Sequence, residues 1–149
     1  MNDAKTALGR KIVAVRKQHG WSWADVAAKL GHSPVWTCAA CLGQMSMAAE
    51  TAERAGALFG LNAEEIALLQ EIPYRGSLPD GVPTDPLIYR FYELLQVYGT
   101  TWKELIHEEF GDGIMSAIDF DMTLERQPDP KGDRVKLTLS GKFQPYKRN

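Results

Sequence analysis

Residues 85–99, DPLIYRFYELLQVYG, predict a helix with clear start and stop signals and an apolar surface on nearly every side. Asp85-Pro86 places a capping side chain before a proline at the first helical position, and Gly99 stands where helices commonly end. The apolar side chains between them lie on more than one face: Leu87, Ile88, Phe91, Tyr92, Leu94, Leu95 and Tyr98. Such a helix needs other protein to cover it. This segment therefore places the C-terminal half of the chain in an interior or at a subunit interface.

Arg90 and Glu93 carry the charges of this helix, and their spacing of three residues puts them side by side. A surface ion pair, worth well under ~1 kcal/mol, would account for them without any function. The apolar surroundings favour a second interpretation, in which protein flanks the pair and the arginine binds a small anion. The pattern alone leaves both interpretations open, because structural ion pairs occupy similar places.

A second helix and then two strands are predicted downstream. Thr101–Glu104 has capping-box spacing, so a new helix is expected there, ending at Gly111. Gly111-Asp112-Gly113 is interpreted as a turn that fixes the position of Ser116. Period-two alternation indicates two strands, one with Ile118, Phe120, Met122 and Leu124 on one side, the other with Val135, Leu137 and Leu139. QPDPKGD, residues 127–133, predicts the hairpin turn between them.

The first half of the chain predicts a bundle of short helices, which Ser33-Pro34 helps to start and Gly31, Gly43 and Gly60 help to end. EIPYRGSLPDGVPTDP, residues 71–86, then predicts an extended linker. A two-stranded hairpin is marginal by itself, so we expect another subunit to complete the sheet. The predicted fold class is therefore α+β, with an N-terminal helical bundle over residues 1–79. A small C-terminal helix-plus-strand domain follows over residues 80–149, with its sheet completed by intertwined dimerisation.

The tight turn Gly31-His32-Ser33 between short helices predicts a repressor-like helix-turn-helix motif. A DNA-binding version needs Lys or Arg for the phosphates and Arg, Asn or Gln on the recognition helix. The recognition position reads SPVWTCAACLGQ, and the stretch from Leu30 to Glu53 contains no Lys or Arg. We therefore expect the motif to be structural and predict no nucleic-acid binding.

Cys38 and Cys41 form a C-x-x-C pair, which can indicate a zinc site or redox chemistry. A structural zinc site needs two more ligands at defined spacing, and His32 alone does not supply them. A redox pair normally stands at a helix N-terminus, whereas this pair lies at least a turn inside its helix. His19, His32 and His107 show no metal-binding spacing either. We therefore expect small packing cysteines and no metal.

The composition excludes several classes of protein without selecting a function. The 149 residues are 44% apolar and 24% charged, with a net charge of −2 that predicts no general attraction to nucleic acid or anionic membranes. No apolar run approaches the ~20 residues of a membrane-spanning helix. The N-terminal residues lack the pattern of a secretory signal, and there are only two cysteines. We therefore expect a cytoplasmic location.

PTDPLIYRFYELLQVYGTTWKELIHEEFGDGIMSAIDF, residues 83–120, resembles the catalytic domain of the cyanase family almost without interruption. The likeness continues in LTLSGKFQP, residues 137–145, and more loosely in LLQEIPYRG, residues 68–76, and LGQ, residues 42–44. The RFYE element and the GDGIMSAI block are together highly specific to that family.

This resemblance implies a function and a set of site residues. The family's catalytic arginine, glutamate and serine fall on Arg90, Glu93 and Ser116. It implies bicarbonate-dependent breakdown of cyanate to ammonia and carbon dioxide, with no metal or organic cofactor. It also implies a decamer of five interlocked dimers with active sites shared between subunits, and an N-terminal repressor-like bundle that does not bind DNA.

The residue types suit this chemistry. Cyanate and bicarbonate are both monoanions, so a cationic fork offsets their repulsion, and arginine supplies one without losing its proton. Ser116 would donate or accept a hydrogen bond at the anion, and no histidine lies in the motif to make it a nucleophile. Glu93 most plausibly orients Arg90, with proton transfer as a second role. Two alternatives remain open, a DNA-binding regulator and a non-catalytic oligomeric module.

Overall fold

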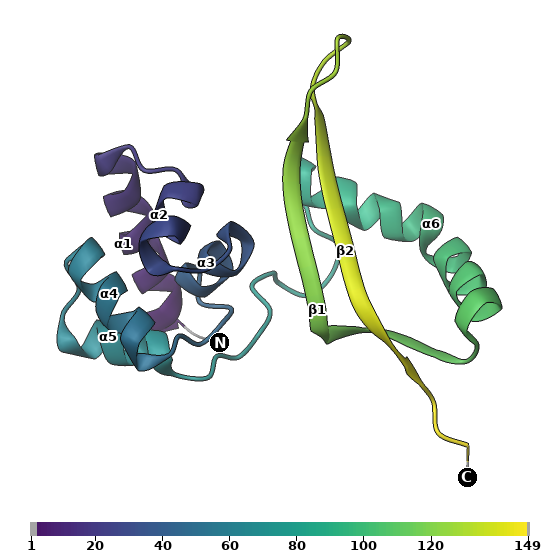
Figure 1. Cartoon of the computed structure of the whole chain (residues 1–149), viewed down its shortest axis with the longest axis horizontal. Coiled ribbons are helices and arrows are strands. Elements are labelled where there is room, and N and C mark those ends of the chain that lie inside the picture. Colours follow the sequence, from purple (N-terminus) through teal and green to yellow (C-terminus); the bar gives the residue numbers. More distant parts are fainter. Residues whose placement is uncertain (1–2, 149) are drawn as a thin grey trace. The chain divides into compact units, whose positions relative to one another are not determined.

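The computed structural model describes residues 3–148, which form five short helices, one long helix and a two-stranded hairpin (Figure 1). The chain separates into two compact units, Met1–Ser77 and Leu78–Asn149. The first unit is all helical, and the second contains the long helix and the antiparallel hairpin. The predicted α+β class is therefore confirmed.

Several ends of the five helices in the first unit carry the capping residues that the sequence predicts. The helices are α1 Asp3–His19, α2 Trp23–Leu30, α3 Pro34–Cys41, α4 Ala49–Phe59 and α5 Ala63–Gln70. The Ser33 hydroxyl accepts the main-chain N–H of Trp36 and so caps α3, with Pro34 at the first helical position. Gly31 and Gly60 adopt the left-handed conformation that ends α2 and α4.

An apolar core holds these helices together, and every helix of the unit contributes to it. Its buried members are Leu8, Ile12, Val26, Leu30, Ala40, Cys41, Met47, Ala52, Ala55, Phe59 and Leu69. Burial raises the pKa of the Cys41 thiol to about 12, and it also raises that of the half-buried Cys38. Reactive thiols have lowered pKa values, so these cysteines act as packing residues, as predicted.

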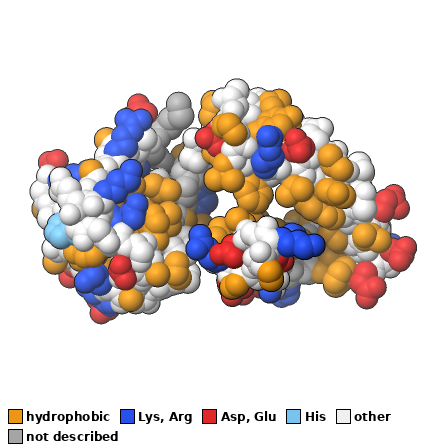
Figure 2. All heavy atoms as spheres, turned by 90° about the horizontal axis from the view of Figure 1, so that it is seen from above, with side chains coloured by type: hydrophobic (Ala, Val, Ile, Leu, Met, Phe, Trp, Pro, Cys, Tyr) orange, Lys and Arg blue, Asp and Glu red, His pale blue; other side chains and the backbone are white. Residues whose placement is uncertain are grey.

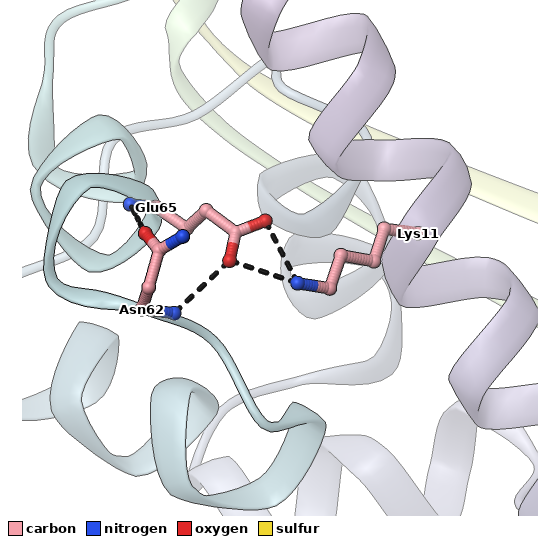
Figure 3. Close-up of polar contacts among 3 residues, drawn as sticks. All are labelled: Lys11, Asn62 and Glu65. Carbon is pink, nitrogen blue, oxygen red and sulfur yellow. Dashed lines mark hydrogen bonds and ion pairs between the residues drawn. The ribbon is translucent and has the colours of Figure 1, made fainter.

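A polar cluster of Lys11, Asn62 and Glu65 ties α1 to the start of α5 (Figure 3). Asn62 and Glu65 form a capping box, in which the Asn62 side chain accepts the Glu65 N–H and the Glu65 carboxylate accepts the Asn62 N–H. The same carboxylate accepts hydrogen bonds from Lys11 Nζ at 2.9 and 3.0 Å. One carboxylate therefore stabilises both a helix end and a contact between two helices.

The predicted linker contains no helix or strand between Glu71 and Asp85, and its first residues are bound to the helical unit. The buried Lys5 donates from Nζ to the main-chain carbonyl of Glu71 at 2.8 Å. The main-chain N–H of Gly76 donates to Gln44 Oε1 at 2.7 Å. These two bonds fix the beginning of the linker on the first unit.

The second unit contains α6, Pro86–Phe110, a single helix of 25 residues. The Asp85 carboxylate caps it by accepting the N–H groups of Leu87 and Ile88, as predicted. The prediction of a stop at Gly99 and a new start at Thr101 is wrong. A glycine inside a helix costs only about 1 kcal/mol, whereas a break would leave up to four N–H and four C=O groups without helical partners.

The hairpin consists of β1, Gly113–Gln127, and β2, Arg134–Pro145, joined at the predicted turn. Direct pairs such as Leu124 with Leu137 and Met122 with Leu139 build one apolar face. The pairs Thr123–Thr138 and Glu125–Lys136 build the opposite, polar face.

Two details of the hairpin differ from the prediction. The first strand already begins at Gly113, so the turn after α6 is shorter than expected. Ile118 does not share the apolar face, because the register shifts between the pairs Met115–Phe143 and Phe120–Gly141. Residues 116–119 form a bulge opposite Lys142, and Ile118 within it is 97% exposed.

Replacing Glu65 by glutamine tests the Lys11–Asn62–Glu65 cluster. The Lys11 hydrogen bond, followed by the Asn62 N–H, lowers the pKa of the Glu65 carboxyl. A lowered folded-state pKa stabilises the fold above the unfolded-state value of about 4.3, and this stabilisation is lost as the pH falls through the folded-state value. Glu65→Gln should therefore unfold at lower urea concentration than wild type at pH 7, and the difference should disappear in acid.

Tryptophan fluorescence can follow this unfolding, since Trp21, Trp23 and Trp36 lie in the first unit. Glu64→Gln is the matched control, because it removes a charge from the same first turn of α5 without touching the cluster. A difference between Glu65→Gln and wild type that persists unchanged in acid would contradict this role of the carboxylate.

Candidate active site

Arg90 and Glu93 lie next to each other on α6, as their spacing predicts. The distance between Arg90 Nη1 and Glu93 Oε2 is 3.8 Å, and the side chains are 64% and 52% exposed within one chain. A long, exposed ion pair contributes little to stability. The expectation that protein encloses this pair is therefore not met by the single chain.

Aromatic side chains accompany the guanidinium group of Arg90 on the same helix. Its carbon lies 5.7 Å from the ring centre of Tyr89, whose ring in turn lies 6.1 Å from that of Tyr92. The Tyr92 hydroxyl accepts a hydrogen bond from Gln96 Nε2 at 2.7 Å. Among residues 3–148, no hydrogen bond uses a guanidinium N–H of Arg90. Its five donors are therefore available for a ligand.

Ser116 lies at the start of the bulge in β1 and is only 3% exposed. Its Oγ accepts two main-chain hydrogen bonds, from the N–H of Ile118 at 3.0 Å and from the N–H of Asp119 at 2.9 Å. A hydroxyl oxygen has two lone pairs and one proton. Both lone pairs are therefore engaged inside the bulge, and the O–H remains as a donor.

Within the described residues, no side-chain base is hydrogen-bonded to Ser116 Oγ. The hydrogen-bond partners of its Oγ are main-chain N–H groups. An N–H donor cannot accept the proton of the serine hydroxyl. Activation of a serine nucleophile needs an adjacent general base. The arrangement therefore favours a hydrogen-bonding serine over a nucleophilic one.

The structure joins two of the three predicted site residues, Arg90 and Glu93, in one ion pair. No hydrogen bond or ion pair within residues 3–148 joins Ser116 to Arg90 or Glu93. The bulge N–H groups of Ile118 and Asp119 were not predicted as parts of the site. The alternation of Ile118 with Phe120 and Met122 carries no sign of the bulge, so the sequence offers no signal for these N–H groups.

The second unit exposes far more apolar surface than a protein that works as a single chain. No residue of α6 is buried, and Figure 2 shows hydrophobic side chains gathered on the surface of this unit. The exposed apolar residues of α6 are Leu87, Ile88, Phe91, Leu94, Leu95, Val97, Tyr98, Trp102, Leu105 and Phe110. Large contiguous apolar surfaces of this kind mark interaction sites.

Residues 3–148 contain neither a cluster of metal ligands nor a membrane-spanning helix. No group of three or more His, Cys, Asp or Glu side chains lies close enough there to hold a metal ion. His32 contacts the Thr51 hydroxyl, and His107 lies between Lys103 and the Gly111 carbonyl. None of the described helices is both long and apolar enough to cross a membrane.

Two protein-family models match this chain, one for each unit. The model described as "Cyanate hydratase, N-terminal" matches residues 5–73, and the model described as "Cyanate lyase C-terminal domain" matches residues 80–148. Arg90, Glu93 and Ser116 lie within the second match.

Individual proteins match over nearly the whole chain. The cyanate hydratase of Variovorax paradoxus (strain S110) is 65% identical over 137 residues, covering 92% of this chain and 93% of the relative. The cyanate hydratase of Polynucleobacter asymbioticus is 58% identical, covering 96% and 97%. The crystal structure of cyanase from T. urticae matches with a TM-score of 0.78 at 36% identity, covering 93% of this chain and 96% of that one. The chain therefore belongs to the cyanate lyase family, whose members are also named cyanases and cyanate hydratases.

Proposed function

We propose that this protein is a cyanate hydratase, which decomposes cyanate with bicarbonate into ammonia and carbon dioxide. The relatives' names support the reaction, and the observation in the structure that supports it most is the Arg90–Glu93 pair with its unused guanidinium donors. Bicarbonate oxygen attacks the carbon of cyanate to give a carboxylated carbamate. This loses carbon dioxide, and the remaining carbamate takes up protons and separates into ammonia and a second carbon dioxide. No step changes an oxidation state, so the reaction needs no redox centre, and positioning and charge stabilisation by side chains can supply most of the rate. We therefore expect neither a metal nor an organic cofactor.

Arg90 is proposed to hold the two anions. Bringing two monoanions to within about 4 Å costs roughly 1 kcal/mol in water and about 4 kcal/mol at the effective dielectric of a protein surface. A guanidinium fork offsets this cost with parallel N–H donors that match oxygen pairs on an anion. Since no other hydrogen bond in the described residues competes for these donors, Arg90 can serve both substrates.

Glu93 is proposed to orient Arg90, because its carboxylate lies beside the guanidinium on the next turn of α6. A carboxylate in direct contact with either substrate would repel it. At 3.8 Å the pair is loose enough for an anion to compete for the same donors. Proton transfer to the cyanate nitrogen is a second role for this carboxyl group.

Ser116 is proposed to donate its O–H to the anionic intermediate. The two main-chain donors on its Oγ leave the proton as the group that can reach a ligand. Negative charge increases on the carbamate oxygens as the bond to bicarbonate forms. A preorganised donor aimed at such a position stabilises the transition state.

The active site is proposed to form between subunits of a homo-oligomer, a decamer of five dimers. The uncovered surface of α6 and the apolar face of the hairpin support this arrangement. Neighbouring copies would cover Arg90 and bring a serine to it.

We expect the assembly in the cytoplasm, where the thiols of Cys38 and Cys41 stay reduced. We expect no nucleic acid as a partner.

Ammonia release tests the proposed function. The purified protein should release ammonia from cyanate, and the rate should depend on added bicarbonate after dissolved carbon dioxide has been removed. Release of two molecules of carbon dioxide for each ammonia would confirm bicarbonate as a reactant. Absence of cyanate-dependent ammonia at saturating bicarbonate would refute the proposal.

Arg90→Lys should lower kcat/KM by about a hundredfold or more, the scale seen when one charge-stabilising donor is lost. Lysine keeps the charge but offers no planar fork. Arg126→Lys is the matched control, since Arg126 is another exposed arginine in a loose ion pair, with Asp133 at 3.7 Å. Both variants should keep wild-type sedimentation. Near-normal turnover by Arg90→Lys would exclude the proposed anion-binding role.

Leu139→Lys tests whether the apolar face of the hairpin lies in a subunit interface. Leu139 is paired with Met122 on that face, so a charge there should dissociate the oligomer and abolish turnover together. Thr138→Lys places the same charge on the opposite face and should leave both properties intact. Sedimentation velocity and the ammonia assay measure the two effects. A dissociated Leu139→Lys protein with full activity would contradict shared active sites.

A further inference from the structure

Gly141 lies in β2 opposite the bulge, where it is paired with Phe120. We propose that Gly141 is a positioning residue for Ser116, because its missing side chain lets the main chain of the bulge come close to β2. This inference rests on the proposed function, since it gives Ser116 a role in that reaction.

The space around Gly141 shows why a side chain is absent there. A Cβ atom at this position would lie 2.5 Å from Met115 Cγ and closer still to the main-chain oxygen of Ser116. Observed Cβ contacts are essentially never shorter than 3.0 Å. The backbone of Gly141 does not adopt a positive φ, so its conformation suits any residue. The close approach of Ser116, and not the backbone angle, therefore requires glycine at this position.

Gly141 and the two bulge hydrogen bonds contact different atoms of Ser116. The main-chain oxygen of Ser116 is packed against Gly141, and its Oγ is held by the N–H groups of Ile118 and Asp119. A methyl group at position 141 would push the Ser116 carbonyl away and rotate the residue within the bulge. Displacing a reacting group by about 1 Å can cost a hundredfold in rate. Gly141 therefore controls where the Ser116 hydroxyl points.

Gly141 could position Ser116 for the reaction or serve only the structure of the hairpin. A double-mutant comparison distinguishes these two roles. If Gly141 acts through Ser116, Gly141→Ala should lower kcat/KM by about a hundredfold in the wild-type background. In a Ser116→Ala background the same change should cost less than about threefold, because the hydroxyl it misplaces is already missing. Equal losses in both backgrounds, or near-normal activity of Gly141→Ala, would overturn the proposal.

Met115→Ala keeps the test decisive if Gly141→Ala alone fails to assemble. This change removes the side-chain clash and leaves only the clash with the Ser116 main-chain oxygen. The double variant Met115→Ala/Gly141→Ala, compared with Met115→Ala, should still lose about a hundredfold in kcat/KM. Recovery of activity in the double variant would show that the Met115 side chain, and not Ser116, is the reason why position 141 needs a glycine. A double variant that also fails to assemble would show that Gly141 serves the fold alone. Either result would overturn the proposal.

Amide hydrogen exchange of residues 116–120, followed by mass spectrometry, separates this inference from the proposed function. Gly141→Ala should speed exchange in this segment, because the Ile118 and Asp119 N–H groups lose the Ser116 oxygen, while the strand near the hairpin turn stays protected. If wild type shows no cyanate turnover but the exchange result holds, the proposed function fails and the positioning of Ser116 by Gly141 stands. Unchanged exchange in Gly141→Ala would overturn the positioning role whatever the activity.

Discussion

Uncovered apolar surface is the constraint on which the second unit depends. A helix of 25 residues without a single buried side chain gains little stability from packing within its own chain. Covering one Leu or Phe side chain contributes about 1.5–3 kcal/mol, and α6 carries many of them, such as Phe91, Leu94 and Leu105. Association of copies can supply this cover, so folding of the second unit and assembly become one equilibrium. The first unit has its own core and its own helix caps, and it does not share this dependence.

In the proposed assembly, the same cover would change the electrostatics of Arg90 and Glu93. In one chain the pair is open to water, which weakens every interaction that the guanidinium could make with an anion. Subunits that bury α6 would remove this water and strengthen the attraction for both substrates. The free energy of the apolar contacts would thereby offset the cost of keeping Arg90 and Glu93 in a site without water. In such a site a fixed charge stabilises the charge of the transition state best. The proposed assembly would thus couple oligomerisation to catalysis through the dielectric around Arg90.

Local signals in the sequence predicted most of the fold, because capping groups act within four residues of where they stand. Ser33-Pro34 starts α3 and Asp85 starts α6 as predicted. The signal at Gly99 failed because a local preference of about 1 kcal/mol was weaker than the hydrogen bonds of a continuous helix. The adjacency of Arg90 and Glu93 follows from helical geometry alone. The bulge at Ser116 cannot be derived in this way. It arises from pairing between the strands and from the close approach of Gly141, and no residue spacing in β1 reveals it.

The bulge also explains how a serine can serve this reaction without becoming a nucleophile. A serine that attacks a carbonyl must offer a lone pair, but both lone pairs of Ser116 Oγ receive main-chain N–H groups. Those two donors withdraw electron density from the oxygen and make its remaining O–H a better donor. In the proposed reaction bicarbonate supplies the oxygen nucleophile, so none is needed from the protein. A site for two anions requires donors and positive charge; in the proposed site Arg90 and a donor-only Ser116 would provide both, and Glu93 would keep the guanidinium in place.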